Sequence, residues 1–494
     1  MQNLNESVVR NIVEEVLKRV TANKAAGGCA AAAFTGGQVL AANTVKNYRG
    51  YNGLFSDPND AVAAARNAFE ELQYRTVAER KDIIDIIRRI VIDQAVELGT
   101  LEMNETKIGR LEHKIDKLVG LGHNAPGTEF RSSEVFSGDH GLTIIEHAPF
   151  GVIGAISPVT HSLPTIANNA INMIASGNTV VFNPHPSGKR IAAEGVRRFN
   201  EAILRIHGID NLINVVVEPT MQTSDIIFKH PQIALLVVTG GPGLAKAAMS
   251  QSKRAIVAGP GNPPVVIDET ADLDRAAKSI IAGGAYDNNL LCLAEKEVFV
   301  VNKVFDAMMS AMERAGAVQF NAAEVDAFTD KGIILTGEGA NKHPAPSRDF
   351  LGKDAKALAA GIGKHISDKV ELLFGETDKN NPFVPVEQMM PFIPFVRVRD
   401  VDEGIDLAKK AEHGFRHTAM IHSNNVDNIT RMARELDTTI FVTNGASTAG
   451  NAGGPAGWSS YSIAGPTGEG ITNPMTFTRS RRYAHVGGLH ILGK

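Results

Sequence analysis

The sequence predicts an α/β protein with parallel sheets, arranged in two or three domains. Its 494 residues exceed what one simple core accommodates. Short apolar runs such as GVIGAISP, NTVVFNP and ALLVVTGG alternate with helical text, which is the pattern of buried strands in a parallel sheet. A second series of the same kind starts at PPVVIDE and continues through KEVFVV, PFIPFVRV, TAMIHS and TTIFVTN. We therefore expect two successive α/β domains that divide near Ala258.

The helices of this fold are expected where apolar residues recur at helical spacing. Asp57 has the character of an N-cap before the amphipathic stretch that follows it. The other helices are expected over residues 78–98, 102–119, 165–174, 188–207, 273–282 and 304–314.

The first 44 residues form a separable segment. Apolar residues recur at helical spacing from Leu4 to Val20 with charged residues between them, which predicts an amphipathic helix over residues 1–20. The Ala/Gly-rich stretch over 21–44 predicts a flexible linker. A tethered helix of this kind is either a partner-docking or targeting peptide or an oligomerisation helix of the same protein, and the pattern leaves both open.

Composition excludes several classes of protein. A net charge of −4 and a pI of about 6.4 provide no general basic field for nucleic acid. The chain has no uninterrupted apolar run of membrane-spanning length, and acidic residues interrupt its N-terminus, so neither a transmembrane helix nor a secretory signal is expected. Its two cysteines, Cys29 and Cys292, exclude a disulfide framework and a cysteine-rich metal site, and they indicate a reducing compartment.

Cys292 lies in YDNNLLCLAEKEVFVV, between a helix-like segment and a strand. A thiolate at such a junction, close to backbone N–H groups, can attack an electrophilic carbon and have the resulting oxyanion stabilised. The alternative is a small core hydrophobe, which is the commoner role of a lone cysteine. Glu295 and Lys296 follow closely and are expected to be a solvated charge pair.

Three glycine-rich segments are candidates for turns or loops, and one of them suggests a nucleotide site. Thr239, Gly240 and Gly241 follow a strand and lead into a helix, where a turn can accept a nucleotide phosphate. The turn is not a full GxGxxG, so an ordinary tight turn remains the alternative. The stretches over 258–264 and 465–470 are dense in Gly and Pro and predict rigid loops.

Several of these segments together match one known family. DNNLLCLAEKEV, VVTGG, AGPGNPPVVIDETADL, NPHPSGKR, VEQMMP, HTAMIHS and GPTGEG resemble the aldehyde dehydrogenase superfamily, and within it the CoA-acylating branch. The resemblance extends from about Asp57 to the C-terminus. It implies an aldehyde dehydrogenase-like fold: a Rossmann-type cofactor domain, an α/β catalytic domain and a small β oligomerisation flap.

The resemblance also implies roles for single residues. Cys292 matches the nucleophile, and Glu387 matches the glutamate that usually holds a nicotinamide ribose. His161 stands where related sequences carry an Asn that helps to hold the substrate oxyanion. A neutral His donates one hydrogen bond, so the backbone N–H of Cys292 is the better-supported oxyanion donor. The other cofactor-binding positions implied are Pro158, Asn183, Pro184, His185, Thr239, Gly240, Gly241 and Gly259.

An absent glutamate favours CoA as the acyl acceptor. Hydrolytic relatives carry a glutamate that activates water where this chain has Ala258–Asn262, which contains no carboxylate. A positioned base contributes about 10²–10⁴-fold, whereas a thiol is acidic enough to attack without one. The expected reaction is therefore NAD-dependent oxidation of a short aliphatic aldehyde to acyl-CoA. A hydrolytic dehydrogenase and a catalytically dead scaffold are the competing hypotheses.

Two further sets of residues each allow two interpretations. His185, His417 and His422 are each either a base for CoA or, more commonly, a satisfied structural histidine. Leu290, Leu291 and Leu293 either line an apolar aldehyde pocket or pack in the core.

Domain limits and partners follow from the resemblance to the propionaldehyde and acetaldehyde dehydrogenases of bacterial microcompartments. It implies an NAD/CoA-binding domain over 45–258, a catalytic domain over 259–470, and a flap formed by 138–150 with 471–494. Residues 1–20 match an encapsulation peptide, which implies a cytoplasmic enzyme in the microcompartment lumen, bound to shell proteins and assembled as a homodimer or homotetramer. The long Ala-rich linker favours propanal, although aldehyde length and NAD versus NADP stay open.

Overall fold

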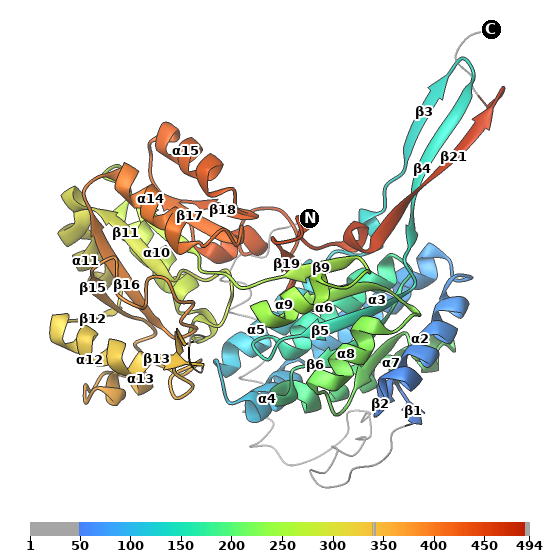
Figure 1. Ribbon diagram of the computed structural model, residues 1–494, viewed down its shortest axis with the longest axis horizontal. Coiled ribbons are helices and arrows are strands. Elements are labelled where there is room, and N and C mark those ends of the chain that lie inside the picture. Colours follow the sequence, from blue (N-terminus) through green and yellow to red (C-terminus); the bar gives the residue numbers. More distant parts are fainter. Residues whose placement is uncertain (1–48, 338, 340–341, 490–494) are drawn as a thin grey trace, which may run out of the picture.

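The computed structural model describes residues 49–337, 339 and 342–489, so the expected helix over 1–20 and linker over 21–44 lie outside the described residues. Two α/β bodies lie side by side, and a narrow β-ribbon projects from one of them (Figure 1). Each body contains one seven-stranded sheet with helices packed against it. The predicted fold class is confirmed.

The first body is built on a sheet whose neighbouring strands are parallel except for the pair β1–β2. In spatial order its strands are β1 (Arg49–Tyr51), β2 (Leu54–Phe55), β7 (Ile213–Val216), β6 (Thr179–Pro184), β5 (Val152–Ser157), β8 (Ile233–Thr239) and β9 (Ala255–Ala258). Its helices are α2 (Pro58–Leu72), α3 (Val77–Asp93), α4 (Ala95–Thr106), α5 (Leu111–Asn124), α6 (Ser162–Ala175), α7 (Lys189–His207), α8 (Met221–Lys229) and α9 (Pro242–Met249). Strands β5 and β6 are buried at every position, which explains their uninterrupted apolar sequence.

The second body has a sheet in which every neighbouring pair is parallel. Its strands, in spatial order, are β12 (Val318–Phe320), β15 (Leu373–Thr377), β16 (Phe392–Val398), β11 (Glu297–Val301), β10 (Pro264–Ile267), β17 (Thr418–His422) and β18 (Ile440–Thr443). Its helices are α10 (Leu273–Gly284), α11 (Phe305–Arg314), α12 (Ala322–Gly332), α13 (Ala355–Gly361), α14 (Val401–Ala411) and α15 (Val426–Leu436), and a hairpin joins β13 (Ile333–Thr336) to β14 (His343–Pro346). Within the described ranges, no helix has the length and apolarity needed to cross a membrane.

The chain passes from the first sheet to the second between Ala258 and Pro264, and it later returns. In the hairpin β19 (Ile463–Ala464) and β20 (Gly470–Ile471), Ile463 packs in the core of the second body and Ala464 in the core of the first. The C-terminal segment therefore ties the two bodies together next to the crossing.

The projecting ribbon has three antiparallel strands (Figure 1). They are β3 (Glu134–Gly138), β4 (Gly141–Pro149) and β21 (Thr478–Val486), and β21 pairs with β4 along its whole length. Segments more than 300 residues apart thus form one ribbon, as expected for the flap.

The expected helices over 78–98 and 102–119 are wrong in their limits, because three helices occupy this region. The chain breaks at Gln94 and again after Thr106, where Lys107 adopts a left-handed conformation with φ of 60°. A Cβ on Gly109 would lie 2.2 Å from Asp287 Oδ1. The second break therefore makes room for a residue of the other body, a contact that helical periodicity does not reveal.

Candidate active site

Most of the expected cofactor-binding positions lie at one edge of the first sheet. Strands β5, β6 and β8 are neighbours, and their carboxyl ends place Ser157 beside Pro184 and bring Thr239 to the same edge. Strand order reverses between β5 and β8, and open parallel sheets bind ligands outside the carboxyl ends of strands at such a reversal. Pro158, Asn183, Pro184, His185, Thr239, Gly240 and Gly241 all lie at this edge.

Gly240 and Gly241 leave open space there. A Cβ on Gly241 would meet nothing within 4 Å, and a Cβ on Gly240 would reach only Leu244, at 3.8 Å. Neither glycine has a positive φ. Packing within the protein therefore does not require glycine here, and a bare backbone at the start of α9 fits the approach of a phosphate-bearing ligand.

Asn183 and His185 differ in how far they are available to a ligand. The Asn183 amide donates to Ser224 Oγ at 2.9 Å and accepts from Thr223 Oγ1 at 2.7 Å, so it ties β6 to the start of α8. His185 is exposed, and its Nδ1 accepts a hydrogen bond from the Ser187 N–H. Of these two side chains, only His185 offers exposed surface to a ligand.

Cys292 follows three consecutive residues in the left-handed conformation. Asp287, Asn288 and Asn289 have φ values of 49°, 56° and 64°. This conformation costs most residues about 1–2 kcal/mol, and Asn and Asp adopt it most readily because their short side chains hydrogen-bond locally. Asn289 donates to the carbonyls of Gly284 and Glu295, both at 2.9 Å. The polar triplet before the nucleophile therefore shapes the backbone.

Lys296 closes the nucleophile segment into a short loop. Its ammonium donates to the backbone carbonyl of Asn289 at 2.8 Å and to its side-chain oxygen at 2.6 Å. The Glu295 carboxylate accepts from the N–H and hydroxyl of Ser447, both at 2.8 Å. Both charged side chains are buried. The interpretation of this pair as solvated is therefore wrong, because the fold provides each charge with its own buried partners.

The crossing segment over 259–263 packs on the backbone of Cys292, the expected nucleophile. A Cβ on Gly261 would lie 2.3 Å from the Cys292 carbonyl oxygen and 3.0 Å from the His417 ring. The Gly261 backbone N–H also acts on the Glu387 carboxyl group and tends to lower its pKa. These contacts bring Cys292, Glu387 and His417 together around one glycine. Gly259 lies in the same segment, where its Cβ would approach Pro466 at 3.0 Å.

The surroundings of Cys292 oppose its ionisation. Burial, together with the nearby Glu387 carboxylate, raises the pKa of the thiol to about 12, while the Lys296 ammonium acts in the opposite direction. Burial also raises the pKa of Glu387 to about 7, against the effect of Lys296. Lys296 is therefore the buried positive charge that acts on both groups.

The segment that packs on the nucleophile contains no carboxylate. Asn262, at its end, donates to the carbonyls of Val384 and Ala411 at 3.0 and 2.9 Å and so anchors the segment. Glu295, close to Cys292 in sequence, is held by Ser447. Neither residue is placed to activate water as a glutamate at Ala258–Asn262 would.

His161 lies in a buried polar cluster at the start of α6. Its Nδ1 is 3.0 Å from Lys117 Nζ, and Lys117 also pairs with the Asp287 carboxylate. Burial and then the positive charge of Lys117 hold the pKa of His161 well below its usual range, so the imidazole is neutral. Lys117 and Asp287 link His161 to the segment that carries Cys292.

Sequence reasoning missed Lys117 and its neighbour Lys114 as interior residues. Both are buried, and Lys114 pairs with the buried Glu102 carboxylate at 3.3 Å. The available signal was their spacing, because Lys114 and Lys117 share a helix face with Leu118 and Leu121. Two lysines on the apolar face of a helix indicate buried partners.

The three candidate histidines lie in different places. His417 is buried beside Gly261, and its Nε2 has no hydrogen-bond partner among the described residues. Burial and then Lys296 lower its pKa to about 4. His417 immediately precedes β17, His422 is the last residue of that strand, and His185 lies at the carboxyl edge of the first sheet. Of the three, only His417 adjoins the segment that packs on Cys292.

The leucines around Cys292 are interior residues. Leu291 and Leu293 belong to the core of the second body, and Leu290 is 2% exposed. These contacts support the core-packing alternative for them.

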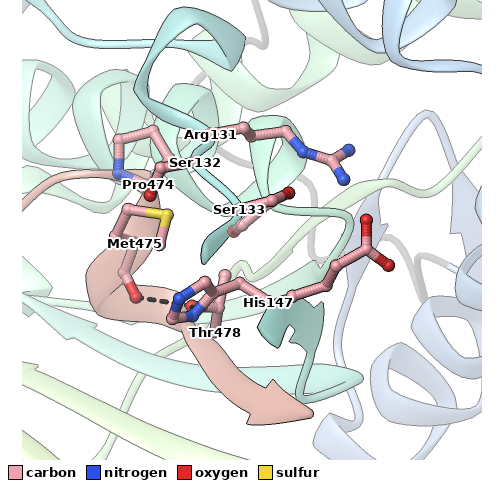
Figure 2. A pocket seen from close by; sticks show the side chains of 9 residues that line it. Arg131, Ser132, Ser133, His147, Pro474, Met475 and Thr478 are labelled. Carbon is pink, nitrogen blue, oxygen red and sulfur yellow. Dashed lines mark hydrogen bonds between the residues drawn. The ribbon is translucent and has the colours of Figure 1, made fainter. Parts of the chain in front are cut away.

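Two cavities lie away from this site. A cavity of about 30 Å³ at the base of the ribbon is lined by Arg131, Glu146, His147 and Thr478, among others (Figure 2). A larger one of about 470 Å³ lies between α12 and α14 at the carboxyl ends of β15 and β16. Across the described residues, no group of three or more His, Cys, Asp and Glu side chains is placed to hold a metal ion.

Comparison with known proteins identifies the family. Residues 50–481 match the model of the aldehyde dehydrogenase family, so the chain belongs to that family. It is 44% identical over 441 residues to an acetaldehyde dehydrogenase (acetylating), EutE, of Salmonella typhimurium, covering 89% of this chain and 94% of the relative. It is 39% identical over 441 residues to a propanal dehydrogenase (CoA-propanoylating) of Citrobacter freundii, covering 89% and 94%. The predicted resemblance to the CoA-acylating branch is confirmed.

A solved structure matches most of the chain. The propionaldehyde dehydrogenase of Rhodopseudomonas palustris, with bound CoA and an acylated cysteine, superposes with a TM-score of 0.85 at 39% identity and covers 88% of this chain and 98% of that one.

Proposed function

We propose that this protein oxidises a short aliphatic aldehyde to acyl-CoA, with Cys292 as the nucleophile and NAD as the hydride acceptor. The observation that carries the proposal is the packing of the carboxylate-free segment 259–263 on Cys292. A thioester formed at this cysteine lacks the base that hydrolysis requires there, whereas a thiol needs no such base.

The residues at the carboxyl edge of the first sheet fit NAD. The open backbone at Gly240 and Gly241 would hold its phosphates, and Glu387 would hold the nicotinamide ribose. When bound, NAD accepts a hydride from the substrate carbon. CoA would reach Cys292 by an overlapping route, as the second substrate of a ping-pong sequence.

The protein's own steps begin with the Cys292 thiol. After losing its proton, the sulfur adds to the aldehyde carbonyl and the oxygen takes the negative charge. The backbone N–H of Cys292 and the side chain of His161 are the donors proposed for this oxyanion. When the oxyanion collapses, the carbon loses a hydride and a thioester to Cys292 remains. The CoA thiolate then displaces Cys292 and leaves with the acyl group.

The CoA thiol can attack without a glutamate at 258–262, and a neutral group close to Cys292 would take up the proton that it loses. His417 is the candidate, because it is neutral and buried next to Gly261, and because its Nε2 has no hydrogen-bond partner among the described residues. A neutral imidazole nitrogen in this position can accept a proton from the incoming thiol.

The deciding experiment mixes the protein with propanal and NAD, with and without CoA. NADH and propanoyl-CoA should form together and only when CoA is present. Formation of the free acid at the same rate without CoA would mean a hydrolytic dehydrogenase. A Cys292→Ala variant should lose all turnover, whereas a scaffold protein would keep its behaviour.

The same proposal extends to location and partners. Relatives in this branch include an enzyme from the fucose utilisation bacterial microcompartment of Clostridium phytofermentans. The amphipathic pattern over 1–20 supports an encapsulation peptide, and propanal is favoured over acetaldehyde by the long linker over 21–44. We propose that the protein lies in the lumen of a bacterial microcompartment in the cytoplasm and binds shell proteins through residues 1–20.

A further inference from the structure

A buried polar cluster lies behind His161, at the junction of the two bodies. Lys117 on α5 approaches three groups: the Asp287 carboxylate, the Thr160 carbonyl at 3.4 Å, and His161 Nδ1 at 3.0 Å. Lys117 is 2% exposed, Asp287 is 0% exposed and His161 is 5% exposed, so water does not compete for these contacts. The cluster connects the start of α6 to the left-handed run before Cys292.

The direction of the Lys117–His161 hydrogen bond follows from the donor inventory. A lysine ammonium has three donors and no acceptor. Burial lowers the pKa of Lys117, and the Asp287 carboxylate acts in the opposite direction by favouring the ammonium form, to which His161 Nδ1 can only be an acceptor. A neutral imidazole that accepts at Nδ1 carries its proton on Nε2.

The other nitrogen of the His161 ring, Nε2, is available to the substrate. Lys117 Nζ lies 3.0 Å from His161 Nδ1, the Thr160 backbone also acts on the ring, and no hydrogen bond to Nε2 is found among the described residues. The ring is also flanked by Tyr461, at 5.6 Å between centroids, and the Tyr461 hydroxyl donates to the Lys117 carbonyl at 3.3 Å. The ring is therefore fixed on one side and carries an unused N–H on the other.

We infer that Lys117, anchored by Asp287, is a positioning residue that fixes His161 as the Nε2–H tautomer, so that its single N–H serves the substrate oxyanion. The inference rests on the proposed function, in which His161 faces that oxygen. It explains how a histidine can stand where related sequences carry Asn. An Asn amide always has a donor, whereas a neutral His offers one only at the protonated nitrogen. The opposite tautomer would present a lone pair to the oxyanion.

A double-mutant cycle tests this coupling in the full-length enzyme. Lys117→Met is made in the native background and in His161→Asn, and the rate of NADH formation in the first turnover is measured with propanal. Loss of a preorganised oxyanion donor costs about 10²–10³-fold. We therefore expect Lys117→Met to lose at least tenfold in the native background. In the His161→Asn background it should lose less than threefold, because an amide has no tautomer to fix. An equal loss in both backgrounds would overturn the inference.

Two further variants control for folding. Lys114→Met breaks the neighbouring buried pair with Glu102, which has no hydrogen bond to the His161 ring, and it should cost the same in both backgrounds. Lys117→Arg keeps a donor-only cation and should recover most of the first-turnover rate. A cost of Lys114→Met that vanishes with His161→Asn would contradict a specific role for Lys117.

The tautomer can also be observed without turnover. The protein is labelled with ¹⁵N-histidine, and the His161 nitrogens are assigned by difference from His161→Asn. We expect a protonated Nε2 and an unprotonated Nδ1 between about pH 6 and 8. The charged and titratable groups around the ring are Lys114, Lys117, Asp287, Lys296, Glu102 and Tyr461. A protonated Nδ1 would overturn the inference even in a protein whose CoA-dependent activity is intact. That activity is tested separately, with Cys292→Ala as the inactive control.

Discussion

Cys292 lies between two opposing charges, and their balance decides how readily it reacts. Burial and the Glu387 carboxylate raise the pKa of the thiol, whereas the Lys296 ammonium lowers it. With a pKa of about 12, the thiol stays protonated in the free protein at neutral pH and its thiolate fraction grows throughout the alkaline range. Alkylation by iodoacetamide should therefore accelerate steadily as pH rises above neutrality.

The Glu387→Gln variant should have opposite effects on the reactivity of the thiol and on the reaction with the cofactor. Removing the carboxylate removes a group that raises the thiol pKa, so more thiolate is present at a given pH and iodoacetamide should react faster than with the native protein. The proposed contact to the nicotinamide ribose is weakened at the same time, so NADH formation should fall by about tenfold or more. If the rate of alkylation by iodoacetamide fell together with the rate of NADH formation, the assigned position of Glu387 would be contradicted.

Gly261 and Gly240 provide a matched pair of glycine substitutions. Gly261→Ala places a Cβ 2.3 Å from the Cys292 carbonyl oxygen, so it should shift the nucleophile loop, lower kcat strongly and lower Tm. Gly240→Ala enters open space and should leave Tm unchanged while it raises the KM for NAD. The measurements are thermal unfolding and steady-state kinetics, and an unchanged KM for NAD in Gly240→Ala would argue against a cofactor at this turn.

Individual residues differ in how far the sequence revealed them. Cys292 and the missing glutamate at Ala258–Asn262 could be read directly, because they are matters of residue identity in a recognisable segment. Lys117 and Lys296 could not, because a lysine is normally a surface residue. Their burial depends on Asp287 and Asn289, partners that are fixed only when the fold is complete.

At the scale of elements, the alternation of buried strands with helices follows from periodicity, but the helix breaks near the site do not. The turn at Lys107 and Gly109 exists because Asp287 of the other body occupies the adjacent space. In the same way, the triplet Asp287–Asn289 has a left-handed backbone, in which Asn289 bonds local carbonyls whereas Asp287 pairs with Lys117 of the other body. Elements that face the second body are shaped by contacts that no local pattern encodes.

The triplet offers a test at this scale. Asn289→Ala removes the amide that donates to the Gly284 and Glu295 carbonyls and puts an unfavourable residue at a φ of 64°. The expected result is a loss of stability of about 2 kcal/mol or more, measured by denaturant unfolding. Asn289→Gly restores the backbone freedom alone and should recover part of this loss. Equal stability of the two variants would mean that the conformation carries no cost.

The ribbon is an element whose apolar surface points outward. Val135, Phe136, Tyr483 and Val486 are each more than half exposed on strands β3 and β21, which pack only on β4 within the described part of the chain. An exposed patch of this kind marks an interface between proteins. We expect Phe136→Asp combined with Tyr483→Asp to convert a dimer or tetramer to a smaller species in light scattering, and an unchanged mass would exclude the ribbon as the oligomer contact.

At the scale of the whole molecule, the segment that determines location should be separable from the part that carries out catalysis. The described part of the chain, from Arg49 onward, contains both sheets, the crossing segment and every candidate site residue. Residues 1–20 lie outside it in sequence and are joined through the Ala/Gly-rich stretch over 21–44, so their removal takes away no group proposed to bind aldehyde, NAD or CoA. Deletion of residues 1–20 should therefore leave kcat and KM unchanged in the purified protein.

The same deletion should abolish co-localisation with shell proteins in cells that produce microcompartments, because the amphipathic face from Leu4 to Val20 is the proposed contact. A variant with Val9 and Val13 both changed to Asp keeps the length of the segment and removes only its apolar face, so it should fail in the same way as the deletion. If either variant instead lost its oligomeric state in light scattering while it still reached the shell, residues 1–20 would be an oligomerisation helix of this protein, the alternative that the sequence pattern leaves open.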